Sequence, residues 1–147
     1  NFNRLNIEAI DGTLHIGVST SILGHNRCVV YVPSVAYERV EMGDGSDFSW
    51  DSCNSDVLSV TVSGGGDCQI KGVTQQLSID SSGGADVKCG ELEAEDVTID
   101  ASGGSDIDAV ANSTLSLTAS GGADIHIKGN PQIVHWDISG GADVEFN

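Results

Sequence analysis

The sequence is poor in positive charge: it has six lysine and arginine residues against 22 aspartate and glutamate residues, and a formal net charge of −16. The six cations are spread along the chain from Arg4 to Lys128, without a cluster. Binding of DNA or RNA needs a basic surface that neutralises phosphates, so the composition predicts no nucleic-acid partner. It disfavours an anionic membrane surface and an acidic polysaccharide substrate for the same reason.

Long apolar runs are also missing. No segment approaches the roughly 18 apolar residues of a transmembrane helix, so we expect no membrane insertion of this segment. The first residues carry neither the basic nor the apolar region of a signal peptide, so we expect any targeting segment to lie outside this chain. Seven aromatic residues and 19 glycines indicate a core of small and β-branched side chains, which argues against a helical bundle.

The four cysteines show no metal-binding pattern. Cys28, Cys53, Cys68 and Cys89 lack the C-x-x-C or Cys/His spacing of a zinc site. Cys68 and Cys89 fall at different positions of the repeat described next, too far apart for a disulfide. We therefore predict that both are free thiols packed as small apolar residues.

The dominant feature is the five-residue phrase SGGxD. It occurs five times at intervals of 18 to 20 residues, with a degenerate copy at residues 43–47, and the full copies begin at Ser63, Ser82, Ser102, Ser120 and Ser139. Apolar residues alternate on both sides of each phrase, which predicts a strand, a turn with both glycines at positive φ, and a second strand. So short a unit buries an apolar face only by stacking on its neighbours.

The repeat predicts an all-β fold: a right-handed parallel β-helix (β-solenoid) with coils of about 19 residues. The hand follows the general preference of parallel crossovers. A left-handed hexapeptide helix is excluded because the intervals vary and no apolar residue recurs every six positions. We expect residues 1–147 to form a single domain, in which residues 1–39 are an irregular N-terminal β-segment that closes the upper end and residues 40–147 form the coils.

The segments IDGTLHI and VVYVP, followed by SGGGD, SGGAD, SGGSD, SGGAD and SGGAD, carry a family resemblance. Together they resemble the auto-transporter adhesin "head GIN" domain, a family of unknown function common in Bacteroidetes. The resemblance implies a right-handed β-helix, export beyond the cytoplasm and a role in cell-surface adhesion. It assigns no catalytic residue and no cofactor, because none is established for the family.

An aspartate after each glycine pair forms the most prominent candidate column. We interpret these carboxylates as acceptors for the backbone N–H groups of their own turns. The alternative is a cation column formed by Asp67, Asp86, Asp106, Asp124 and Asp143. Two residues further on, a second outward column of alternating charge is expected to pair across the strands, and it comprises Lys88, Asp108, His126 and Glu145. Trp50 and Trp136 are expected in the core.

The favoured function is a non-enzymatic, extracytoplasmic surface module for adhesion or envelope organisation. Its expected partner is a glycan or protein at a cell surface, together with self-association through the solenoid ends. The alternative is a carbohydrate-active enzyme, a glycoside hydrolase or polysaccharide lyase, on a β-helix scaffold. Such an enzyme needs a carboxylate pair, and among 22 acidic residues a suitably spaced pair carries little information.

Overall fold

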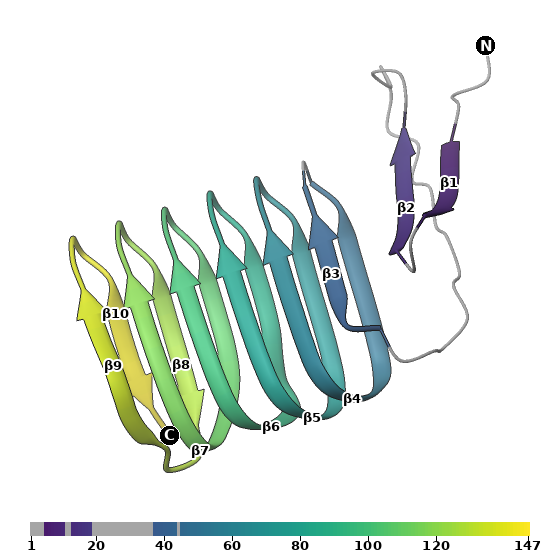
Figure 1. The fold of residues 1–147 in the computed structure, drawn as a ribbon. Helices are drawn as coiled ribbons and strands as arrows, with labels where there is room; N and C mark the ends of the chain where they lie inside the picture. Colours follow the sequence, from purple (N-terminus) through teal and green to yellow (C-terminus); the bar gives the residue numbers. More distant parts are fainter. Residues whose placement is uncertain (1–4, 11–12, 19–36, 44) are drawn as a thin grey trace. The chain divides into compact units, whose positions relative to one another are not determined.

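The computed structural model describes residues 5–10, 13–18, 37–43 and 45–147, and all regular elements among them are β-strands (Figure 1). Internal contacts divide the chain into two compact units, residues 1–33 and 34–147. The expected boundary after residue 39 lies within the second unit, close to its start. That the two units make up a single domain stays a prediction.

The first unit contains a two-stranded antiparallel sheet. Strand β1 (Leu5–Ile10) pairs with β2 (Thr13–Val18), with Leu5 opposite Val18 and Ile10 opposite Thr13. In the sequence these strands flank an Asp-Gly dipeptide, which is typical of two-residue hairpin turns. The predicted N-terminal β-structure is confirmed for these two strands, whereas the expected strand at residues 28–32 lies outside the described residues.

The second unit is a stack of parallel strands whose pairing follows the repeat. Asp67 lies opposite Asp47 on one side and Asp86 on the other, so each copy pairs with the equivalent residues of the next. This register confirms the predicted β-solenoid with coils of about 19 residues. The strands are β3 (Arg39–Met42), β4 (Asp47–Val62), β5 (Asp67–Ser81), β6 (Asp86–Ala101), β7 (Asp106–Ala119), β8 (Asp124–Lys128), β9 (Gln132–Ile138) and β10 (Asp143–Phe146).

Each long strand, β4 to β7, curves back between its two ends, so each coil has two flat sides (Figure 1). We call the stack of segments that follow the turns the post-turn layer; it contains residues 47–50, 67–71, 86–90 and 106–110, with β8 and β10. The segments that precede the turns form the pre-turn layer. The inward side chains of both layers make one apolar core, whose largest buried members include Leu58, Ile70, Leu77, Ile79, Ile99, Ile107, Leu117 and Ile127.

The turns between the layers require glycine at one position. In each SGGxD copy the first glycine has positive φ, as at Gly103 with +80°, and the second does not. The expectation of two positive-φ glycines is therefore wrong. The first glycine packs on the turn of the preceding coil: a Cβ on Gly103 would lie 2.7 Å from the carbonyl oxygen of Gly83, whereas a Cβ on Gly104 would meet nothing within 4 Å.

The last described coil departs from the predicted columns. Ile133 pairs with Leu115 and Trp136 with Leu117, because a bulge between these pairs accommodates an additional residue, so Val134 leaves its expected inward column. Trp136 is 45% exposed and stacks on Phe146, with ring centroids 6.0 Å apart. Its prediction as a core residue is wrong, since no further coil covers it among the described residues. Self-association through the solenoid ends stays a prediction.

The first coil agrees better with expectation. Trp50 is 7% exposed and packs edge-on against Tyr37, with ring centroids 5.4 Å apart, which confirms it as a core residue. Cys68 and Cys89 are buried free thiols, also as predicted, and Cys53 is a third. Cys28 lies outside the described residues.

Candidate functional site

The aspartate column exists, but among the described residues the carboxylates of Asp67, Asp86, Asp106 and Asp124 accept no hydrogen bond from their own turns. From Asp47 to Asp143 the aspartates lie opposite one another in successive strands. The turn N–H groups instead donate to backbone carbonyls of the preceding coil, as Gly104 N does to Gly83 O at 2.9 Å and Asp106 N to Ala85 O at 3.0 Å. For these four aspartates the interpretation as turn acceptors is therefore wrong, and several of the turn N–H groups bond to the backbone ladder between coils instead.

Within the part of the chain that the structure describes, no group of three His, Cys, Asp or Glu side chains is arranged to hold a metal ion. At Asp143 the carboxylate accepts a hydrogen bond from Val144 N at 3.1 Å. Binding of a cation along Asp67, Asp86, Asp106, Asp124 and Asp143 stays a prediction.

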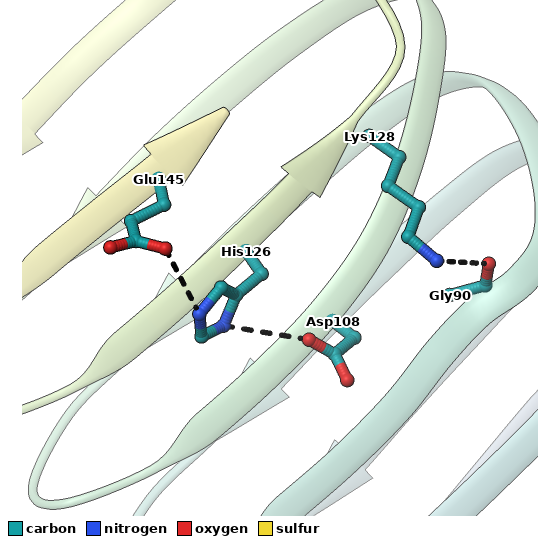
Figure 2. A network of polar contacts seen from close by, with 5 residues as sticks. All are labelled: Gly90, Asp108, His126, Lys128 and Glu145. Carbon is teal, nitrogen blue, oxygen red and sulfur yellow. Dashed lines mark hydrogen bonds and ion pairs between the residues drawn. The ribbon is translucent and has the colours of Figure 1, made fainter. Parts of the chain in front are cut away.

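The outward column of alternating charge pairs over three of its four members. His126 lies between two carboxylates: its Nδ1 is 3.5 Å from Asp108 Oδ1 and its Nε2 is 3.4 Å from Glu145 Oε2 (Figure 2). Lys88 is opposite Asp108 in the register, yet among the described residues its ammonium has no ion-pair or hydrogen-bond partner. The predicted pairing is thus confirmed from Asp108 to Glu145 and fails at Lys88.

Lys88 contributes instead to a hollow of about 210 Å³ on the outer surface of the post-turn layer. We call it the lysine hollow, because all three lysines of the chain line it. Its lining residues are Gln69, Lys71, Lys88, Gly90, Glu91, Asp108 and Lys128. The expectation that the cations do not cluster is therefore wrong: residues from strands β5, β6 and β8 that are distant in sequence come together when the coils stack.

A bulge and a glycine open the hollow. Gln69 pairs with Lys88 and Lys71 with Glu91, so β6 holds one more residue than β5 between these pairs, at Cys89 and Gly90. Gly90 is not among the glycines with positive φ, and a Cβ there would make no contact closer than 3.4 Å. The backbone therefore does not require glycine at this position, and the effect of the missing side chain is to leave space.

Lys128 reaches into this space from β8. Its side chain crosses β7, and Nζ lies 3.4 Å from the carbonyl oxygen of Gly90 on β6, to which it donates a hydrogen bond (Figure 2). A Cβ added to Gly90 would meet the same Nζ. Lys128 can rest over the peptide because residue 90 has no side chain.

The third ammonium belongs to a surface ion pair. Lys71 Nζ is 3.0 Å from Glu91 Oε2, and both side chains are partly exposed. The hydrogen bond and the negative charge of Glu91 raise the pKa of Lys71, with a smaller contribution from Asp51. The hollow thus presents three ammonium groups against the carboxylates of Glu91 and Asp108. Cationic side chains therefore outnumber anionic ones in its lining, although the net charge of the chain is −16. This lining suits an anionic group.

The alignment of copies held a signal for this cluster. Lys71 and Lys128 each stand four residues after a repeat aspartate, and Lys88 stands two after, so the repeat places all three on the outer side of the same layer. Position along the sequence hid this proximity. The bulge at Gly90, which shapes the hollow, has no signature in the alternating pattern.

The geometry defines a parallel β-solenoid protein with a charged hollow on the outer surface of its post-turn layer. The chain belongs to the family described as "Putative auto-transporter adhesin, head GIN domain", whose model matches residues 1–131. The resemblance drawn from the repeat phrases is therefore confirmed. No curated protein matches the sequence.

One similar solved structure is described as a "putative lipid binding protein" from Parabacteroides distasonis. It superposes with a TM-score of 0.71 at 20% sequence identity over 74% of this chain. The match covers 44% of that protein, so this chain spans less than half of its length. At this identity the likeness shows a shared fold. No helix among the described residues is long and apolar enough to cross a membrane.

Proposed function

We propose that this domain is a non-enzymatic, extracytoplasmic surface module that contributes to cell adhesion or envelope organisation by binding a glycan or a protein at a cell surface. The observation that carries the proposal is the lysine hollow, which lies on the outer surface of a β-solenoid whose neighbouring coils are paired strand to strand. The family's description as an adhesin head domain supports it. Export beyond the cytoplasm is part of the proposal, and the same description supports it.

The chemistry of the hollow favours binding over catalysis. A glycosidase needs two carboxyl groups that act on the same bond from fixed positions. In the hollow the carboxylate of Glu91 lies 3.0 Å from the ammonium of Lys71 and that of Asp108 lies 3.5 Å from the imidazole of His126, so each already has a partner within the protein. At about 210 Å³ the hollow is also smaller than the roughly 300–1,000 Å³ of typical small-molecule pockets.

The same lining argues against a lipid chain as ligand at this place. Binding of an acyl chain needs an apolar cavity, because its affinity comes from removing apolar surface from water. The lysine hollow is lined by charged and amide side chains together with one glycine. The name of the structural relative is consistent with a binding role for the fold, whereas the lining of this hollow indicates a polar ligand.

The test uses the full chain on a glycan array and on immobilised cell-surface proteins, with adhesion of beads coated with the domain to cells as a second measurement. We expect saturable binding and bead adhesion that soluble domain competes away. A parallel incubation with a panel of polysaccharides, followed by a reducing-end assay, tests the enzyme alternative. Release of new reducing ends would overturn the proposal, and so would the absence of binding to every array and cell surface.

A further inference from the structure

We propose that the lysine hollow binds one acidic sugar unit of a glycan, that is, a sugar that carries a carboxylate or a sulfate. This inference rests on the proposed function as a surface-binding module and adds the chemical class of the ligand. It starts from the concentration of positive charge: three of the six lysine and arginine residues line a single hollow of about 210 Å³.

The free ammonium of Lys88 is the first anchor. Lys71 is neutralised in part by Glu91 and Lys128 donates to the carbonyl of Gly90, whereas Lys88 has no partner among the described residues. In the register, Lys88 lies between Gln69 on β5 and Asp108 on β7. The carboxylate of Asp108 is already 3.5 Å from Nδ1 of His126. An anionic group placed beside Lys88 would gain a charge-assisted hydrogen bond without breaking an ion pair.

Lys128 is the second anchor, from the opposite side of the space above Gly90. Its hydrogen bond to the Gly90 carbonyl is long, at 3.4 Å, and leaves two of its three N–H donors available. Two ammonium groups on strands β6 and β8 can therefore converge on one carboxylate or sulfate that sits over the glycine. Figure 2 shows the Lys128 side chain directed at Gly90 across the intervening strand.

The remaining lining fits the hydroxyl groups of a sugar. Gln69 offers an amide, and Glu91 and Asp108 offer carboxylate oxygens that accept hydrogen bonds from hydroxyls. A site for a bare inorganic anion would not benefit from carboxylates in its wall, because they repel the anion. The hollow is smaller in volume than ordinary small-molecule pockets, so we expect it to hold a single sugar. Its ammonium groups suit one charged substituent of that sugar, and its amide and carboxylate groups suit the hydroxyls.

The charge of the whole chain selects against dense polyanions. The chain as a whole has a net charge of −16, and at physiological ionic strength the field of a surface charge extends over a Debye length of about 8 Å. One anionic group can reach the lysines inside this distance, whereas further charges along a polyanion would face the acidic surface. We therefore expect an isolated acidic sugar within a glycan to bind better than DNA or a densely sulfated chain.

The test is calorimetric titration of the full chain with a trisaccharide that carries a single uronic acid between two neutral sugars and, as a matched neutral probe, its methyl ester. We expect the acid to bind at least tenfold more tightly than the ester. A sulfated galactose trisaccharide and its desulfated form make the second pair, which distinguishes the two anionic groups. Vesicles containing phosphatidylglycerol and a DNA oligonucleotide are expected not to bind.

Two variants probe the site itself. Lys88→Gln removes the unpartnered ammonium, and we expect at least a tenfold loss of affinity for the acidic probe at unchanged melting temperature. Gly90→Thr fills the space above the peptide and displaces the Lys128 ammonium, and it should abolish binding while the melting temperature stays the same or rises, because a β-branched residue suits a strand better than glycine. The matched control is Arg39→Gln, which removes the same charge at an exposed residue paired with Glu41 on β3 and should leave affinity unchanged.

The outcomes separate this inference from the proposed function. If the acidic and neutral probes bind equally, or if Lys88→Gln and Gly90→Thr bind the acidic probe like the wild type, the acidic-sugar site is overturned. Binding of other glycans or proteins on the arrays would then leave the surface-module proposal intact. Binding of the vesicles without binding of either trisaccharide would overturn the sugar site in favour of a lipid headgroup.

Discussion

The hydroxyl of Ser81 donates a hydrogen bond to the hydroxyl of Ser105, 3.0 Å away on the next coil, and the two side chains are 1% and 0% exposed. Ser105 has a further acceptor in the carbonyl oxygen of Ser102, at 3.1 Å. Neighbouring coils place alanines at the corresponding positions, such as Ala101 with Ala123. The pair is thus one polar link inside a core that is otherwise apolar beside the turns.

This link predicts an asymmetric pair of substitutions. Ser105→Ala leaves the buried Ser81 hydroxyl without its acceptor and should lower the free energy of unfolding by roughly 1–3 kcal/mol. Ser81→Ala should cost less, because Ser105 still donates to Ser102. The double variant should be close to wild type, since it reproduces the alanine pair of the next coil. Urea unfolding of all four proteins measures these differences, and equal costs for the two single variants would contradict the assigned donor direction.

The glycine pair of each turn predicts a sharp contrast between adjacent residues. Gly103→Ala should destabilise the fold by at least about 1–2 kcal/mol, because it puts a Cβ at positive φ and 2.7 Å from a carbonyl oxygen. Gly104→Ala should be neutral, since its Cβ would enter open space. Thermal melts followed by circular dichroism compare the two variants. Equal losses of stability would show that the turn does not have this geometry.

The aspartate column predicts that removing a charge stabilises the protein. The Asp106 carboxylate lies in register between those of Asp86 and Asp124, so Asp106→Asn should relieve repulsion and stabilise by roughly 0.2–1 kcal/mol in low salt. Asp143→Asn should gain less, because its register partner is Asp124 alone and its own carboxylate accepts a hydrogen bond from Val144 N. Both gains should shrink in 1 M NaCl, where the Debye length is about 3 Å. A lower melting temperature for Asp106→Asn would instead favour a cation bound along the column.

The repeat shows which part of the fold can be predicted from the sequence. Alternation around SGGxD predicts the parallel register, so Leu77 opposite Val97 and Asp67 opposite Asp86 follow from alignment alone. Alignment assumes equal spacing, however, and it fails where a copy holds an extra residue. The bulge before His135 removes Val134 from the inward column, and which residue bulges depends on packing rather than on pattern.

For the candidate site, the spacing of the lysines along the sequence suggests that they are far apart, whereas their positions in the aligned repeat copies place them on the same layer. Lys71, Lys88 and Lys128 are scattered in the sequence, but the stacking of coils brings them to one hollow. The pattern also could not reveal that the turn donors bind carbonyls of the preceding coil, because alternation describes side chains and leaves the backbone partners open. Alternation alone therefore predicts a turn-acceptor role for the Asp carboxylates, whereas backbone carbonyls accept from turn N–H groups such as that of Gly104.

The buried thiols predict how stability depends on pH. Burial raises the pKa of Cys68 to about 12, from an ordinary value near 9, and it raises the pKa of Cys89 as well. Between these values the unfolded chain has lost the thiol proton while the folded chain keeps it, so the unfolded state binds fewer protons. The free energy of unfolding should therefore be unaffected by these groups below about pH 8 and fall as the pH rises through 9 towards 12, by up to about 1.4 kcal/mol per pH unit for each thiol.

Tyrosines and lysines also titrate in this range, so the measurement is a comparison of slopes. Cys68→Val replaces one thiol by an apolar side chain of the kind found next to it in the column, at Val87. Urea unfolding at intervals from pH 7 to pH 11 should show a shallower decline for Cys68→Val than for the wild type, with the two curves differing by a constant below about pH 8. The contribution of the thiols would be refuted by parallel curves over the whole range, because an exposed Cys68 would ionise equally in the folded and unfolded chains.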